Sequence, residues 1–142
     1  MPWVILVIVG AVVLYAWAAG GLDVGQSIIE KIAIAIQTFE GYFPGSVSFR
    51  NNNPGNLKYA RQPGTTGQDA RGFAIFATFD EGWDALIALL NKRAAQHPEW
   101  TLLDLFNSYA PPTDNNNPEQ YASFVAEHTG LTPDTTLGGI LG

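Results

Sequence analysis

A single glutamate, Glu40, stands at the end of a strongly apolar stretch and directly before a glycine. Its neighbours Phe39, Tyr42 and Phe43 are aromatic, so a carboxyl held against them would be poorly hydrated. Desolvation raises the pKa of a carboxyl because it disfavours the charged form. A carboxylic acid that stays protonated near neutral pH can protonate a leaving oxygen, which is the step that glycoside cleavage requires. The alternative is a solvated glutamate at a helix end, without a chemical role.

Two asparagines, Asn53 and Asn56, flank a Pro-Gly pair a short distance after the glutamate. An asparagine side chain can both donate and accept hydrogen bonds, which suits sugar hydroxyls and N-acetyl groups. We therefore expect both residues to contact a substrate. Asparagine beside Pro-Gly is also typical of tight turns, so a purely local role is the alternative, and it applies more strongly to Asn53 than to Asn56.

Composition excludes several other kinds of chemistry. The chain of 142 residues has no cysteine, which rules out a disulfide framework, a cysteine nucleophile and a thiolate metal site. Its two histidines, His97 and His128, do not favour a multi-histidine metal site, so we expect neither a metal nor a cofactor. Thirteen acidic residues against seven basic ones give a net charge of −6, and nucleic acid is not an expected partner.

The first 22 residues contain no charged side chain, and the first charged residue is Asp23. About 20 apolar residues span a bilayer as a helix, and aromatic residues near both ends of this stretch suit the membrane interfaces. We predict one N-terminal transmembrane helix, residues 1–22, that contacts membrane lipid through residues 3–22. A cleaved signal peptide is the alternative, because residues 16–18 have a small-x-small pattern, but no basic residue precedes the apolar run.

Residues 23–142 are long enough for one domain. Apolar residues at helical spacing predict a helix from about Val24 to Phe39. Capping and proline signals predict further helices at about 79–96, between Thr101 and Pro111, and at about 118–130. Residues 42–72 are rich in loop signals, and residues 73–76 form a short strand candidate. The predicted fold is mainly α with a small β-hairpin.

The residues around the glutamate resemble those of a known family. The run at 39–48, Phe-Glu-Gly-Tyr-Phe-Pro-Gly-Ser-Val-Ser, resembles the catalytic-glutamate segment of soluble lytic transglycosylases and goose-type lysozymes. Further segments are similar, in order, to a phage and prophage group of small virion-associated muramidases: Arg50–Leu57, Gly72–Phe76, Glu81–Leu86, Tyr109–Pro111, Asn115–Asn116 and Tyr121. The resemblance covers about residues 32–137. The chain departs from the pattern at Gly41, where the family has serine, and lacks the family's Gly-Leu-Met-Gln segment.

The resemblance implies an α+β lysozyme-like fold and cleavage of the β-1,4 bond between N-acetylmuramic acid and N-acetylglucosamine in peptidoglycan. By this likeness Glu40 is the general acid and later the base. The residues expected to bind substrate are Asn53, Asn56, Gln68, Tyr109 and Tyr121. One glutamate suffices in lytic transglycosylases, because the 6-hydroxyl of the sugar attacks the anomeric carbon. A hydrolase would need a second carboxylate or a positioned water, and Asp69 is the candidate carboxylate, ahead of Asp80 and Glu81.

Two functions follow from this resemblance and the apolar N-terminal segment. The first is a membrane-anchored, peptidoglycan-degrading glycosidase of a virion that opens the wall during phage infection. Its expected partners are peptidoglycan, membrane lipid and other virion proteins. It would reside in an internal virion membrane or the bacterial inner membrane, with the domain facing the wall. The alternative is a non-catalytic structural membrane protein of a virion with a lysozyme-like wall-binding domain. Glu40 favours the enzyme, because a binding domain has no need of it.

Overall fold

The structure, a computed structural model, describes residues 26–141, so the transmembrane helix predicted at residues 1–22 lies outside the described part of the chain. Among residues 26–141, no helix combines the length and the apolarity needed to cross a bilayer. The described part is mainly helical and has one two-stranded antiparallel sheet, which confirms the predicted class of a mainly α protein with a small hairpin. In chain order the elements are α2 (Ile28–Phe39), α3 (Val47–Arg50), β1 (Thr65–Gln68), β2 (Ala74–Phe76), α4 (Phe79–Gln96), α5 (Leu102–Tyr109), the 3-10 helix η3 (Pro112–Asp114), α6 (Pro118–Thr129) and α7 (Leu137–Leu141).

Helix α2 is the central buried helix that the sequence predicts, although it begins later than Val24. Ser27 is its N-cap, and the side-chain oxygen of Ser27 accepts a hydrogen bond from the amide of Glu30 at 3.1 Å. Ile32 and Ile36 are almost completely buried on its inner face. The helix ends at Phe39, with Glu40 as its C-cap, so the sequence and the packing together place Glu40 at the rim of the core.

The predicted caps of the later helices are confirmed. Thr101 and Asp104 form a reciprocal capping box at the start of α5. Helix α6 has Asn117 as N-cap, Pro118 in its first turn, and Gly130 at its end in the left-handed conformation that glycine adopts without strain. These local signals fix where α5 and α6 begin and end, and the two helices then pack against each other.

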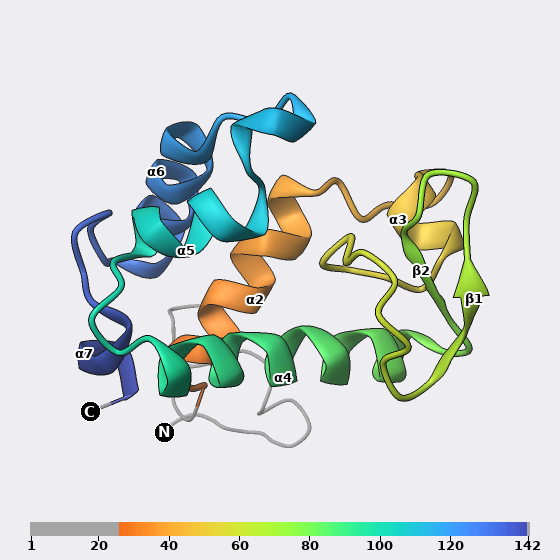
Figure 1. Cartoon of the computed structure of the whole chain (residues 1–142), viewed down its shortest axis with the longest axis horizontal. Coiled ribbons are helices and arrows are strands. Elements are labelled where there is room, and N and C mark those ends of the chain that lie inside the picture. The colour runs from red at the N-terminus through yellow and green to blue at the C-terminus, as the bar shows by residue number, and fades with distance from the viewer. Residues whose placement is uncertain (1–25, 142) are drawn as a thin grey trace, which may run out of the picture.

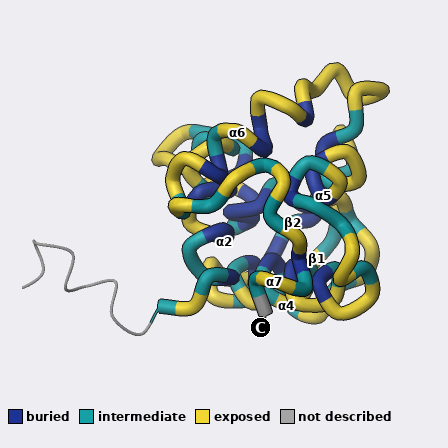
Figure 2. The backbone as a smooth tube through the Cα atoms, turned by 90° about the vertical axis from the view of Figure 1, so that its left-hand side faces the viewer, coloured by how far each residue is buried: buried dark blue, intermediate teal, exposed yellow. Residues whose placement is uncertain are grey.

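The hairpin pairs β1 with β2 in antiparallel register, with a bulge between Thr65 and Gly67. Figure 1 shows this hairpin and α3 on one side of the molecule and α5, α6 and α7 on the other, with α4 running along both. Helix α2 packs against α4 and α6, and the most buried stretches in Figure 2 lie inside this arrangement. Helix α4 therefore contacts both parts of the molecule, β2 of the hairpin on one side and α2 and α7 on the other.

Gly82 in α4 permits a close approach between this helix and the loop before the hairpin. A Cβ atom at position 82 would overlap the backbone carbonyl oxygen of Asn52. We expect Gly82→Ala to lower the free energy of unfolding by about 2 kcal/mol, because the backbone must shift to relieve the overlap. At an unconstrained helix position the same change stabilises by up to about 1 kcal/mol. Unfolding in urea measures the free energy of unfolding of the variant and of the wild type. A variant more stable than the wild type would contradict the close packing at Gly82.

Candidate functional site

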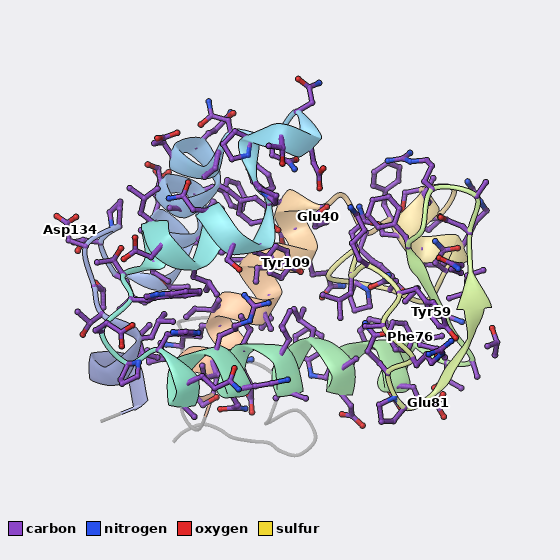
Figure 3. All side chains as sticks on the ribbon, in the orientation of Figure 1. Glu40, Tyr59, Phe76, Glu81, Tyr109 and Asp134 are labelled. Atoms are coloured by element: carbon purple, nitrogen blue, oxygen red, sulfur yellow. The ribbon has the colours of Figure 1, made fainter. Side chains whose placement is uncertain are left out.

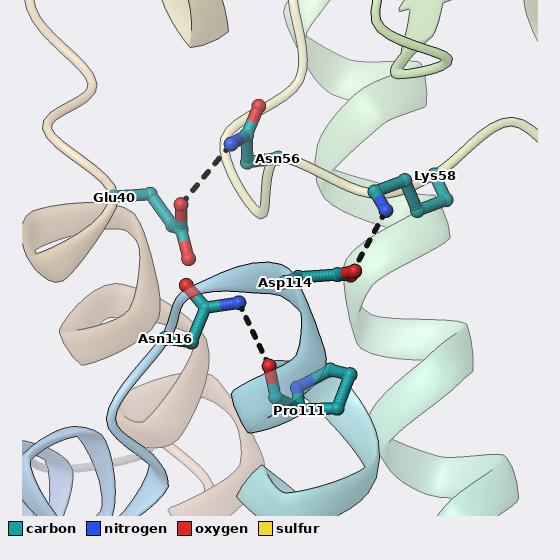
Figure 4. Close-up of polar contacts among 6 residues, drawn as sticks. All are labelled: Glu40, Asn56, Lys58, Pro111, Asp114 and Asn116. Atoms are coloured by element: carbon teal, nitrogen blue, oxygen red, sulfur yellow. Dashed lines mark hydrogen bonds and ion pairs between the residues drawn. The ribbon is translucent and has the colours of Figure 1, made fainter.

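Glu40 is held by two side chains that come from distant parts of the chain. The hydroxyl of Tyr121, on α6, donates a hydrogen bond to Oε2 of Glu40 at 2.7 Å. The amide nitrogen of Asn56, in the loop between α3 and β1, donates to Oε1 at 3.2 Å. Figure 4 shows the carboxyl facing the amide of Asn56. Each carboxyl oxygen thus has one neutral donor, and the orientation of the group is fixed.

The environment of Glu40 favours its protonated form. Burial raises the pKa of this carboxyl from its ordinary value, because the charged form loses hydration. The hydrogen bonds from Tyr121 and Asn56 act in the opposite direction, since both stabilise the carboxylate, but burial is the larger effect. This carboxyl therefore keeps its proton to a higher pH than a hydrated glutamate does.

The tyrosine beside Glu40 is fixed by aromatic packing. The ring of Tyr121 is 1 % exposed and stacks against Phe39 at 4.0 Å and Phe106 at 4.3 Å between ring centroids. Tyr109 meets the same ring edge-on at 5.9 Å, and its hydroxyl donates to the carbonyl of Gly55. Burial raises the pKa of both tyrosines well above the usual value, so both hydroxyls stay protonated donors.

Asn56 has an unused hydrogen-bonding atom. Its backbone adopts a positive φ of 50°, a conformation that asparagine tolerates better than most residues. While the side-chain nitrogen donates to Glu40, the side-chain oxygen is buried and has no hydrogen-bond partner in the described part of the chain. A buried acceptor without a donor is costly. Because this oxygen has almost no accessible surface, a ligand bound in the cleft does not reach it in this conformation.

Asn53 lies in the interior and is completely buried. Its side-chain nitrogen donates to the carbonyls of Leu57 and Ala74, both at 2.9 Å, and its side-chain oxygen accepts from the amide of Leu57 at 2.8 Å. These bonds join the Asn-rich loop to β2. The structure therefore gives Asn53 a role in shaping the loop that carries Asn56, in place of the predicted contact with substrate.

A cleft of about 790 Å³ lies beside Glu40. Figure 3 shows Glu40 and Tyr109 between the helices and the hairpin side of the molecule. The residues that line the cleft come from α4, α5, η3 and the segment around the hairpin. They are Glu40, Asn56, Leu57, Lys58, Ala60, Gln62, Pro63, Arg71, Phe73, Ala85, Ala88, Leu89, Lys92, Arg93, Ser108, Tyr109, Ala110, Asp114 and Asn116. Three predicted site residues, Glu40, Asn56 and Tyr109, are among them, and Tyr121 reaches the cleft through Glu40.

Gln68 and Asp69 lie on the hairpin and do not line the cleft. Asp69 accepts hydrogen bonds from the amides of Arg71 and Phe73 and from the side chain of Asn51. These bonds, led by that from Phe73, lower the pKa of this carboxyl. Asp69 therefore stabilises the turn between β1 and β2. The sequence suggested it as a second carboxylate in the cleft, but in the structure it does not line the cleft.

Sequence reasoning missed the positively charged residues of the cleft. Lys58, Arg71, Lys92 and Arg93 all line it. Lys92 and Arg93 are adjacent on α4, but Lys58 and Arg71 are distant from them along the chain, so the sequence alone does not show that the four share one cleft. Lys58 also forms an ion pair with Asp114 of η3 at 3.2 Å. Figure 4 shows this ion pair near Glu40 and Asn56.

Within residues 26–141, no group of three or more His, Asp or Glu side chains is arranged to hold a metal ion. Comparison of the chain with protein-family models, with curated proteins and with solved structures found no match in any of the three.

Proposed function

We propose that the chain is a peptidoglycan-degrading glycosidase that cleaves the β-1,4 bond between N-acetylmuramic acid and N-acetylglucosamine, with Glu40 as its general acid. The observation that carries the proposal is the protonatable carboxyl of Glu40, oriented by Tyr121 and Asn56 at the wall of an open cleft. A carboxylic acid in a weakly hydrated site is what protonation of a glycosidic oxygen requires.

The arrangement of the elements is consistent with the lysozyme-like fold that the sequence resemblance implies, and we propose that fold for residues 23–142. A helical part formed by α2, α5 and α6 lies on one side of the cleft, and the hairpin side lies on the other. A cleft between two such parts can take an extended glycan strand. Glu40, at the end of the central helix, would face the middle of that strand.

The proposed reaction follows the lytic transglycosylase route. Glu40 gives its proton to the bridging oxygen as the bond between that oxygen and the anomeric carbon of N-acetylmuramic acid breaks. The Glu40 carboxylate then takes the proton of the 6-hydroxyl of the same sugar, and the 6-oxygen bonds to the anomeric carbon. The products are a 1,6-anhydro end and a free 4-hydroxyl, and Glu40 returns to its protonated form.

The surroundings of the other carboxylates favour this route over hydrolysis with a second carboxylate. Asp69 is engaged by three hydrogen bonds in the hairpin turn. Asp114 lines the cleft but is paired with Lys58. A carboxylate whose charge is already compensated is a poor nucleophile or base. Asn56 lines the cleft beside Glu40, and its neutral amide orients the acid without adding charge.

The setting of the reaction belongs to the same proposal. The uncharged stretch at residues 1–22 would hold the enzyme in an internal virion membrane or the bacterial inner membrane, with the domain facing the wall. Local cutting beside the membrane would let a phage open the wall without general lysis. Other virion proteins are the expected neighbours of an enzyme held in this way.

The proposal is tested by incubating the whole chain, purified in a mild neutral detergent, with purified peptidoglycan and following the release of soluble muropeptides. We expect release that depends on enzyme concentration. Because burial raises the pKa of Glu40, release should persist to a higher pH than an ordinary glutamate would allow. Absence of release by folded protein across the pH range would overturn the proposal.

Tyr121→Phe provides a second test through pH dependence. The Tyr121 hydrogen bond lowers the pKa of Glu40, so its loss should raise that pKa and move the alkaline limb of the rate profile to higher pH. The rate at the optimum should fall about tenfold, because the carboxyl loses one of its two orienting bonds. A matched control is Tyr59→Phe, which lies outside the cleft. If the rate fell but the alkaline limb of the pH–rate profile stayed at the same pH, Tyr121 would not act through its hydrogen bond to Glu40.

A further inference from the structure

The charge of the cleft is opposite to that of the chain. The chain has seven lysine and arginine residues against thirteen acidic ones, with a net charge of −6. Four of those seven cations, Lys58, Arg71, Lys92 and Arg93, line the cleft. Of the twelve acidic residues within 26–141, only Glu40 and Asp114 do so. An acidic protein that gathers most of its cations in one cleft focuses a positive field there.

The four cations surround the cleft from both sides. Lys58 and Arg71 lie on the hairpin side, over the ring of Phe73, at 5.4 and 5.0 Å from its centroid. Lys92 and Arg93 lie near the end of α4. Arg93 is oriented by its hydrogen bond to the hydroxyl of Ser108 on α5. A strand lying in the cleft would therefore pass between cations on opposite sides.

Part of this positive charge has no compensating carboxylate. Lys58 is paired with Asp114, and Arg71 lies near enough to Asp69 to lower the pKa of that carboxyl. Among the described residues, Lys92 and Arg93 form no ion pair within 4 Å. Glu40 adds little negative charge when it is protonated, and burial favours that form. Lys92 and Arg93 are thus available to anionic groups of a ligand.

We propose that the cleft selects an anionic glycan and that Lys92 and Arg93 bind carboxylates carried by the side chains of the strand. In peptidoglycan these are the carboxylates of the peptides attached to N-acetylmuramic acid. A neutral strand of N-acetylglucosamine would leave both cations without partners. This inference rests on the proposed function for the identity of the strand, but the charge selection can be measured without any cleavage.

The test uses the whole chain carrying Glu40→Gln, so that bound strands stay intact. Its binding is measured by co-sedimentation with peptidoglycan stripped of attached polymers, with the same material after its carboxyls are converted to amides, and with chitin. We expect amidation to weaken binding about tenfold at low salt, and the difference to shrink as salt rises. Chitin should bind no more tightly than the amidated material.

Matched variants locate the effect. Lys92→Gln together with Arg93→Gln, in the same Glu40→Gln background, should weaken binding to native peptidoglycan about tenfold and leave binding to the amidated material unchanged. Lys31→Gln together with Arg61→Gln removes the same amount of charge from residues outside the cleft. This pair should change binding neither to native nor to amidated peptidoglycan. If both pairs had equal effects, the net charge of the protein would explain the binding and the inference would be overturned.

The two proposals fail in different ways. Equal binding of native and amidated peptidoglycan would overturn the charge selection, even if the wild-type chain releases muropeptides. Carboxylate-dependent binding through Lys92 and Arg93, together with no release by the wild-type chain, would support the charge selection and overturn the enzymatic proposal. The protein would then be a wall-binding domain with an anion-selective cleft.

Discussion

Replacing Glu40 with glutamine should lower the rate of muropeptide release by about 10²–10⁴-fold, the usual contribution of a positioned general acid. Glutamine has nearly the same shape, and its oxygen can still accept the hydrogen bond from Tyr121. It cannot supply a proton to the leaving oxygen. The initial rate of release, compared at equal concentrations of folded protein, measures the effect.

A matched control separates chemistry from charge and stability. Glu127→Gln removes one carboxylate from the exposed face of α6 and should leave the rate unchanged. The stability of Glu40→Gln is measured alongside, because its amide nitrogen would face the donor nitrogen of Asn56, and rates are compared only at equal folded fractions. A Glu40→Gln variant with nearly full activity would eliminate Glu40 as the acid.

Asn53→Ala should lower the free energy of unfolding by about 3 kcal/mol, since three hydrogen bonds of a completely buried side chain are lost. The amide of Leu57 and the carbonyl of Ala74 would lose that partner in the interior. Denaturant unfolding of the whole chain measures the effect. Activity should fall as well, because Asn56 and its contact with Glu40 depend on the same loop.

The exposed amide Asn91 provides the comparison. It lies on the surface of α4 and bonds only to the carbonyl one turn earlier, so Asn91→Ala should change stability by less than about 0.5 kcal/mol. If Asn53→Ala were as stable as the wild type but failed to bind peptidoglycan, Asn53 would contact substrate, and its assignment to the loop would be wrong.

The elements that sequence reasoning located correctly are those with strong local signals. Thr78, Thr101 and Asn117 act as N-caps, and the helices they start lie where the sequence predicts them. Glu40 was identifiable for the same reason, because its position depends only on the apolar helix before it and the glycine after it. Capping and helical periodicity are properties of a few neighbouring residues, so a single sequence reveals them.

The parts that escaped prediction depend on distant contacts or on very short elements. Helix α3 has only four residues, too few to produce a periodic pattern. The resemblance pointed to Tyr121 as a substrate-binding residue, but its hydrogen bond to Glu40, 81 positions away, depends on the packing of α6 on α2. The cations of the cleft come together in the same way, through the arrangement of α4 and the hairpin. Both arrangements depend on tertiary packing, which local sequence patterns do not reveal.

The most direct measurement of the central claim is mass spectrometry of the products formed from purified peptidoglycan in water labelled with heavy oxygen, with the wild-type chain and with Glu40→Gln. We expect 1,6-anhydro ends without heavy oxygen from the wild type, and at least about a hundredfold fewer from the variant in the same time. Labelled reducing ends would contradict attack by the 6-hydroxyl of the sugar and would indicate hydrolysis. Equal amounts of product from both proteins would contradict the assignment of Glu40 as the acid.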